Sequence, residues 1–118
     1  MHTSLVLRGD VFMANLDPVE GSEQAGTRPV VVISRDALNQ ASSVIVVASI
    51  TDVANKKRIY PSHVRVPLGA GGLTMDSIVL CEQIRAISKT RLRRQLGRFD
   101  QATMARLEIA LRITLDLA

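Results

Sequence analysis

Polar side chains that could bind a charged ligand border three apolar runs of the sequence. Arg28 stands directly before "PVVVIS", and Thr51 ends "VIVVASIT". Further along, "LCEQIR" adds Glu82, Gln83 and Arg85 at the end of another apolar run. Polar groups at the ends of buried strands are well placed to line one cleft. An arginine in such a cleft would suit a phosphate, because the guanidinium offers a fork of donors that matches phosphate oxygens.

A long polar loop precedes the first of these apolar runs. Loop and run together read "DPVEGSEQAGTRPVVVIS", residues 17–34. Its simplest interpretation is a hairpin loop in which Pro18, Gly21 and Gly26 make the turns and the charges keep the segment solvated. The alternative is a loop that frames a functional cleft. The polar residues at the neighbouring strand ends favour the second interpretation.

Short apolar runs bounded by turn-forming residues predict the strands that would position these side chains. Three of the runs are continuous and rich in β-branched residues, which indicates burial on both faces. "HVRVP" alternates instead and predicts a half-exposed strand. The predicted strands are "DVFMANL" (10–16), "PVVVIS" (29–34), "SVIVVASIT" (43–51), "HVRVP" (63–67) and "SIVLCEQI" (77–84).

The sequence after residue 99 changes to a helical pattern. Asp100 is a plausible N-cap, and Glu108 and Arg112 are spaced as an i,i+4 ion pair. The apolar stripe expected to pack on the sheet is Met104, Leu107, Leu111 and Leu115. Strands followed by a helix predict a mainly β fold, a small and highly curved antiparallel sheet or barrel closed by a C-terminal helix. We expect one domain, residues 1–118.

Composition limits the function classes. The 15 Lys and Arg residues against 11 Asp and Glu give a net charge of +4, which mildly favours a polyanionic partner. The single cysteine, Cys81, rules out an intrachain disulfide framework and a thiolate metal cluster, and we expect it to be a core thiol. No apolar run reaches the length of a membrane span. These features fit a cytoplasmic protein that does not act at a membrane.

Three segments in order, "RGDVFMANLDPVEGSEQAGTRPVVVIS", "VASIT" and "EQIRAISKTRL", resemble the MazF/PemK family of toxin endoribonucleases across essentially the whole chain. The resemblance implies an SH3-like small barrel (MazF/Kid/CcdB-like) with short helices and a C-terminal helix. It also implies the toxin of a type II toxin-antitoxin system, which forms a homodimer, inhibits growth and binds an antitoxin with an acidic disordered tail. The implied activity is cofactor-free, metal-independent and sequence-specific cleavage of single-stranded RNA, leaving 2′,3′-cyclic phosphate and 5′-hydroxyl ends.

The resemblance also implies site residues. The family's catalytic arginine of "TRPV" and threonine of "SIT" correspond here to Arg28 and Thr51. The loop "GSEQAG" borders the RNA groove in the family, and "EQIR" either reads bases or holds the groove wall. These segments make Ser22, Glu23, Gln24, Glu82, Gln83 and Arg85 candidates for substrate binding. Met13 stands where many relatives carry an aromatic residue.

Two basic segments could follow an RNA backbone. For "NKKR", with Lys56 and Lys57, the sequence leaves RNA binding and simple solvation open. For "KTRLRRQLGR", residues 89–98, solvated charges are favoured. With only three aromatic residues, the chain lacks the stacking surface of a sequence-tolerant single-strand binder.

Proton abstraction from the ribose 2′-hydroxyl has no obvious agent in the sequence. Arginine stays protonated and a hydroxyl is not basic. The chain has two histidines, His2 and His63, and we expect His63 at the surface or rim; Glu23 is a candidate base by analogy with other carboxylate bases. Two rival functions remain, a CcdB-like poison that binds DNA gyrase without catalysis and an inactive barrel that binds only its antitoxin.

Overall fold

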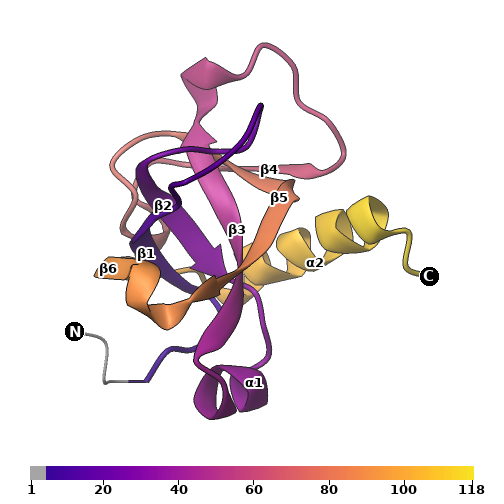
Figure 1. Ribbon diagram of the computed structural model, residues 1–118. Coiled ribbons are helices and arrows are strands. Elements are labelled where there is room, and N and C mark those ends of the chain that lie inside the picture. The colour runs from indigo at the N-terminus through magenta and orange to yellow at the C-terminus, as the bar shows by residue number, and fades with distance from the viewer. Residues whose placement is uncertain (1–4) are drawn as a thin grey trace.

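The structure is a computed structural model that describes residues 5–118, and within this range it forms one six-stranded antiparallel sheet (Figure 1). The strand order along the sheet is β4-β5-β3-β2-β1-β6. The strands are β1 Asp10–Asn15, β2 Thr27–Val32, β3 Val44–Asp52, β4 His63–Val66, β5 Ser77–Ser88 and β6 Leu92–Arg98. All five predicted strands are therefore present, and the sheet gains a sixth.

Helices complete the fold. Two α-helices, α1 Asp36–Ala41 and α2 Gln101–Leu115, and three short 3-10 helices, η1 Val53–Asn55, η2 Ala70–Gly72 and η3 Lys89–Arg91, are seen among residues 5–118. The predicted N-cap is confirmed, because Asp100 Oδ1 accepts the Thr103 N–H at 2.8 Å. That hydrogen bond also lowers the pKa of Asp100. No helix in the described range is long and apolar enough to cross a membrane.

Helix α2 packs on β4 and β5 with part of its predicted stripe. Met104 and Leu107 are buried, but Leu115 is half exposed because the last turn projects past the sheet (Figure 1). The predicted Glu108–Arg112 pair is not the one formed. Glu108 Oε2 instead forms an ion pair with a terminal nitrogen of Arg8 at 3.4 Å, and this pair links the helix to the segment before β1.

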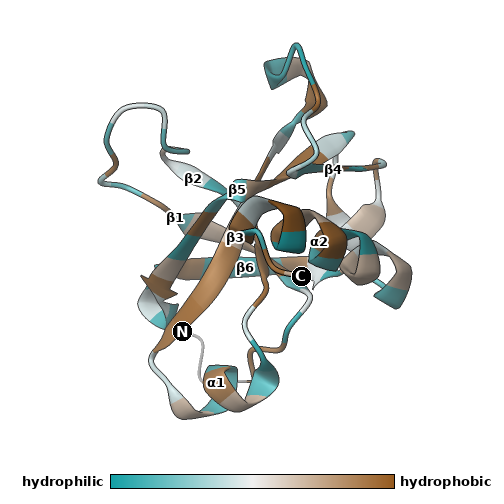
Figure 2. Cartoon of the chain, turned by 90° about the vertical axis from the view of Figure 1, so that its right-hand side faces the viewer, coloured by the Kyte–Doolittle hydropathy of each residue, from teal (hydrophilic) through white to brown (hydrophobic). Residues whose placement is uncertain are grey.

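The central strands are buried on both faces, as their continuous apolar runs predict. In β2, Val31 belongs to the core cluster beneath α2, while Val30 and Val32 belong to the cluster on the other side. Figure 2 shows the hydrophobic colour running along β3 through the middle of the molecule. In β4 the expected alternation is only partial, because Arg65 is exposed while the other three residues are buried.

Contact between the two edges of the sheet closes the barrel. Helix η2, which connects β4 to β5, lies against the far edge strand β6. A Cβ atom on Gly72 would stand 2.0 Å from the Leu96 carbonyl oxygen, so only glycine permits this approach. Gly72 also has a φ of 79°, in the left-handed region that glycine adopts freely.

Strand β5 departs from the prediction in its length. It continues to Ser88, so Glu82, Gln83 and Arg85 lie in its middle and not at its end. Its pairing with β3 jumps from Ser49↔Leu80 to Ala48↔Ile84, which leaves residues 81–83 outside the ladder. A bulge of this kind re-aims side chains and bends the strand.

Candidate active site

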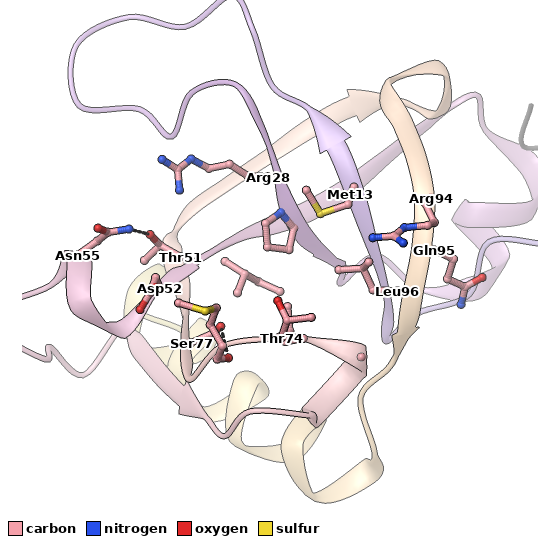
Figure 3. Close-up of a pocket in the computed structure, with 15 residues that line it drawn as sticks. Met13, Arg28, Thr51, Asp52, Asn55, Thr74, Ser77, Arg94, Gln95 and Leu96 are labelled. Carbon is pink, nitrogen blue, oxygen red and sulfur yellow. Dashed lines mark hydrogen bonds between the residues drawn. The ribbon is translucent and has the colours of Figure 1, made fainter.

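A cavity of about 540 Å³ opens at one end of the barrel (Figure 3). Strands β1, β2, β3 and β6, helices η1 and η2 and the start of β5 contribute to its wall. The lining residues are Met13, Arg28, Pro29, Ile50, Thr51, Asp52, Asn55, Gly72, Leu73, Thr74, Met75, Ser77, Arg94, Gln95 and Leu96. Both predicted catalytic residues are among them.

Arg28 reaches this cavity from the start of β2. Strands β2 and β3 pair through Val30↔Ser49, and continuing this register by two residues sets Arg28 across from Thr51. The Arg28 side chain is half-buried, and its Nε donates to the Ala25 carbonyl at 2.9 Å. Its terminal nitrogens have no protein partner among residues 5–118. The guanidinium is therefore anchored at one atom and free to donate at the others.

Thr51 lies in the cavity wall with only 3% of its surface exposed. Its Oγ1 accepts a hydrogen bond from Asn55 Nδ2 at 3.0 Å, drawn in Figure 3. Asn55 belongs to η1, which follows β3 directly because Asp52 caps it by accepting the Ala54 N–H at 2.9 Å. Asn55 was missed from the sequence. Its position four residues after Thr51 was the signal that could have identified it.

The opposite end of the cavity carries a second arginine. Arg94 lies on β6 and faces the cavity across Met13 from Arg28 (Figure 3). Arg94 is also exposed to solvent, so the interpretation of residues 89–98 as solvated charges stays a prediction at this position. Met13, a polarisable thioether, occupies the wall between the two guanidinium groups.

A second pocket of about 350 Å³ holds most of the predicted substrate-binding residues. Its lining is Glu23, Gln24, Ser49, Glu82, Gln83, Ile84 and Arg85. The bulge in β5 produces this grouping by turning residues 81–83 away from β3. Among the described residues, Gln24 Oε1 is buried in this region without a hydrogen-bond partner.

Two of these residues hold the long loop between β1 and β2. Gln83 Nε2 donates to the Ser22 carbonyl at 3.3 Å, and Gln83 Oε1 accepts the Gln24 N–H at 3.4 Å. Arg85 donates to the carbonyl of the fully buried Leu16 at 2.8 Å. The resemblance left open whether "EQIR" reads bases or holds the groove wall, and these contacts are of the second kind.

Comparison with known proteins identifies the family. The model of the PemK-like, MazF-like toxins of type II toxin-antitoxin systems matches residues 7–115. The chain belongs to this family. It is 44% identical to the Endoribonuclease MazF of Staphylococcus epidermidis over 113 residues, 96% of this chain and 93% of that protein. The prediction of a PemK/MazF toxin endoribonuclease is therefore confirmed.

Solved structures of the PemK/MazF type confirm the predicted fold class. An endoribonuclease in complex with its cognate antitoxin, from a mycobacterial species, superposes with a TM-score of 0.79 at 25% identity over 96% of this chain and 97% of that one. MazF from Deinococcus radiodurans gives a TM-score of 0.80 at 24% identity over 96% and 98%. The second likeness supports the fold alone.

The prediction that His63 lies at the surface or rim of this PemK/MazF toxin is wrong, because the residue is buried. The residue is 8% exposed, and its Nε2 lies 2.9 Å from Glu82 Oε2. Its Nδ1 accepts the Tyr60 N–H at 3.2 Å, so Nε2 is the nitrogen that donates to the carboxylate. With both nitrogens engaged, His63 holds the loop before β4 and is not placed to take a proton from substrate.

Partial burial would raise the pKa of Glu82, but hydrogen bonds outweigh it. The His63 side chain, the residue's own backbone N–H and the Ser62 hydroxyl all donate to the carboxylate, and the electrostatic effect of the His63 ring adds to them. The net result is a pKa below the ordinary value. Glu82 is therefore an ionised anchor for His63 in the bulge.

The remaining predicted residues are spread around the loops. Lys56 is half-buried and Lys57 exposed after η1, and neither lines the main cavity. Glu23 lines the second pocket, and its Oε1 accepts the Glu20 N–H at 2.7 Å. Its use as a general base stays a prediction. His2 lies outside the described residues.

Two other kinds of catalytic group are a cysteine nucleophile and a bound metal ion. Cys81 is the predicted core thiol, fully buried, and burial followed by the nearby charge of Glu82 raises its pKa to about 11. It is therefore poorly suited to act as a nucleophile. Residues 5–118 contain no cluster of three His, Cys, Asp or Glu side chains that could hold a metal ion.

Proposed function

We propose that this PemK/MazF toxin cleaves single-stranded RNA at short sequence motifs through the ribose 2′-hydroxyl, without a metal ion. The 2′-hydroxyl loses its proton and its oxygen attacks the adjacent phosphorus, while the bond to the 5′-oxygen breaks and that oxygen takes up a proton. The products are a 2′,3′-cyclic phosphate and a 5′-hydroxyl. The observation that carries this proposal is that Arg28 and Thr51 share one cavity, on adjacent strands.

The two residues supply complementary donors to the scissile phosphate. Negative charge grows on the non-bridging oxygens as the 2′-oxygen adds, and fixed donors in a sheltered site stabilise that charge most effectively. Arg28 has its terminal nitrogens free for this purpose, while its Nε is held by Ala25. Thr51 offers a hydroxyl proton from the buried end of β3.

The cavity also favours an elongated polyanion. Arg94 extends the positive surface from Arg28 to β6, so successive phosphates could bind at the two ends. The second pocket, with Glu23 and Gln24 from the loop between β1 and β2, supplies polar groups for reading bases. Lys56 and Lys57 would add backbone contacts outside the cavity.

The proposed partners follow from the family and the charge. The mycobacterial relative was solved with its cognate antitoxin. For this chain, with a net charge of +4, we expect an antitoxin whose acidic disordered tail binds a toxin homodimer in the cytoplasm and blocks its inhibition of growth.

The proposal is tested by incubating purified protein, in excess chelator, with a long defined RNA and with its DNA copy, and sequencing the fragment ends. The expected result is cleavage of RNA alone at one recurring short motif. Cleavage of DNA, or activity that needs added divalent metal, would contradict the proposal.

The gyrase-poison alternative is separated by growth assays. An Arg28→Ala toxin that folds normally is expected to lose growth inhibition, because the phosphate loses its main donor. Retained toxicity of the folded Arg28→Ala protein would favour a binding poison over an enzyme.

A further inference from the structure

The hydrogen bond between Asn55 and Thr51 connects a residue outside the predicted catalytic pair to one member of that pair. Asn55 Nδ2 donates to Thr51 Oγ1 at 3.0 Å, and both side chains line the main cavity (Figure 3). Thr51 is almost fully buried, whereas Asn55 lies on the exposed side of η1.

The direction of this bond constrains the Thr51 proton. A hydroxyl has one proton to donate and two lone pairs that accept. An amide nitrogen only donates, so the Thr51 proton cannot point at Asn55 and must turn elsewhere. Accepting a hydrogen bond also polarises a hydroxyl and strengthens it as a donor. The bond therefore prepares Thr51 to donate into the cavity.

Helix η1 is fixed by contacts that do not involve the Asn55 side chain. Asp52 caps it through the Ala54 N–H at 2.9 Å, and the Val53 N–H donates to the Asp76 carbonyl at 3.0 Å. The Lys56 N–H donates to the Val53 carbonyl at 3.2 Å, which closes the turn of η1. The turn does not need the Asn55 amide for its own backbone, so the amide is available to act on Thr51.

We propose that Asn55 is a positioning residue that orients the Thr51 hydroxyl toward the scissile phosphate. This inference rests on the proposed function of Arg28 and Thr51. It assigns Asn55 no contact with the reacting atoms, and its effect passes through Thr51.

The test is a double-mutant cycle on a short RNA that contains the cleaved motif. Rates are measured at saturating enzyme for wild type, Asn55→Ala, Thr51→Ala and the double variant, so that slow cleavage is still quantified. Asn55→Ala is expected to lower the rate by about 10-fold to 100-fold, as loss of orientation does. In the Thr51→Ala background the same change is expected to have less than a twofold effect.

Two further measurements separate positioning from structure. Binding of an RNA made uncleavable by one 2′-deoxy nucleotide is expected to change less than twofold in Asn55→Ala, with an unchanged melting temperature. In a Thr51→Ser protein, which keeps a hydroxyl, Asn55→Ala is expected to lower the rate again.

An unchanged rate in Asn55→Ala, or an equal loss in the presence and absence of Thr51, would overturn the positioning role. Full activity of Thr51→Ala would overturn it together with the proposed role of Thr51. Normal dependence on Thr51 with no dependence on Asn55 would overturn this inference alone and leave the proposed function standing.

Discussion

At the scale of single residues, two arginines near the same loop have different uses because their donors are differently occupied. Arg28 uses only its Nε in a hydrogen bond within the described residues, so its terminal nitrogens can still donate. Arg85 donates from a terminal nitrogen to the Leu16 carbonyl. A guanidinium with free donors can bind a phosphate. One that satisfies a buried carbonyl stabilises the fold, since an unsatisfied buried acceptor is costly.

This difference predicts opposite phenotypes for matched substitutions. Arg85→Met removes the donor to Leu16 and is expected to lower the free energy of unfolding by about 1–3 kcal/mol. Arg28→Met is expected to change stability by less than about 1 kcal/mol but to abolish most cleavage. Urea unfolding and cleavage rates measure both. Equal stability losses in the two variants would contradict the assignment.

The lowered pKa of Glu82 predicts a pH-dependent contribution to stability. A carboxyl whose pKa falls on folding stabilises the protein above its ordinary pKa and loses that effect as the pH drops through the folded value. Glu82→Gln is therefore expected to lower the melting temperature at neutral pH by a few degrees at most, because the carboxylate is partly exposed.

The difference between Glu82→Gln and wild type is expected to shrink on acidification below 4.5, the ordinary pKa of the group. Thermal melts between about pH 3 and pH 8 measure it. A difference that grows toward low pH would mean that the carboxylate is not the stabilising form.

At the scale of elements, the site depends on how the barrel closes. Helix η2 brings the β4–β5 connection onto β6, and both contribute to the cavity wall. The approach is so close that Gly72 has no room for a side chain beside the Leu96 carbonyl. The contact between η2 and β6 therefore both closes the barrel and forms part of the cavity wall.

Gly72→Ala is accordingly expected to destabilise the protein by about 2–4 kcal/mol, from overpacking and left-handed backbone strain together. Gly69→Ala is the matched control, because Gly69 also has a positive φ but nothing within 4 Å of its Cβ position. It is expected to cost only about 1 kcal/mol. Equal losses in denaturant unfolding would show that strain alone, and not the contact with β6, explains the effect.

Elements with a strong apolar pattern could be predicted from the sequence, and those without one could not. The run ending at Thr51 was predictable because it is continuous and buried, and the C-terminal helix was predictable from its Asp100 cap and from the helical spacing of its apolar residues. Strand β6 carries several arginines and buries only Leu92, so periodicity does not reveal it. Helix α1 is six residues long, and its N-cap, Arg35, makes no side-chain cap.

At the scale of the whole molecule, distant segments converge on one basic cavity. Arg28, Thr51 and Arg94 come from three strands, and the net charge of +4 favours a polyanion. The family resemblance predicted Arg28 and Thr51 as catalytic residues, and both line this cavity. Arg94 depends on the long-range pairing of β6 with β1, and the pair of buried His63 and partly exposed Glu82 depends on the β5 bulge; local sequence encodes neither. This explains why the candidate site was only partly predictable.

The central claim is that Arg28 serves cleavage through the 2′-hydroxyl. It is tested most directly by the cleavage rate of a short motif-containing RNA in excess chelator, for wild type and Arg28→Ala, with the new 5′ ends identified. We expect 5′-hydroxyl ends from wild type and a rate lower by about 10²–10³-fold or more in Arg28→Ala. Wild-type rates in Arg28→Ala, or 5′-phosphate ends, would contradict the account.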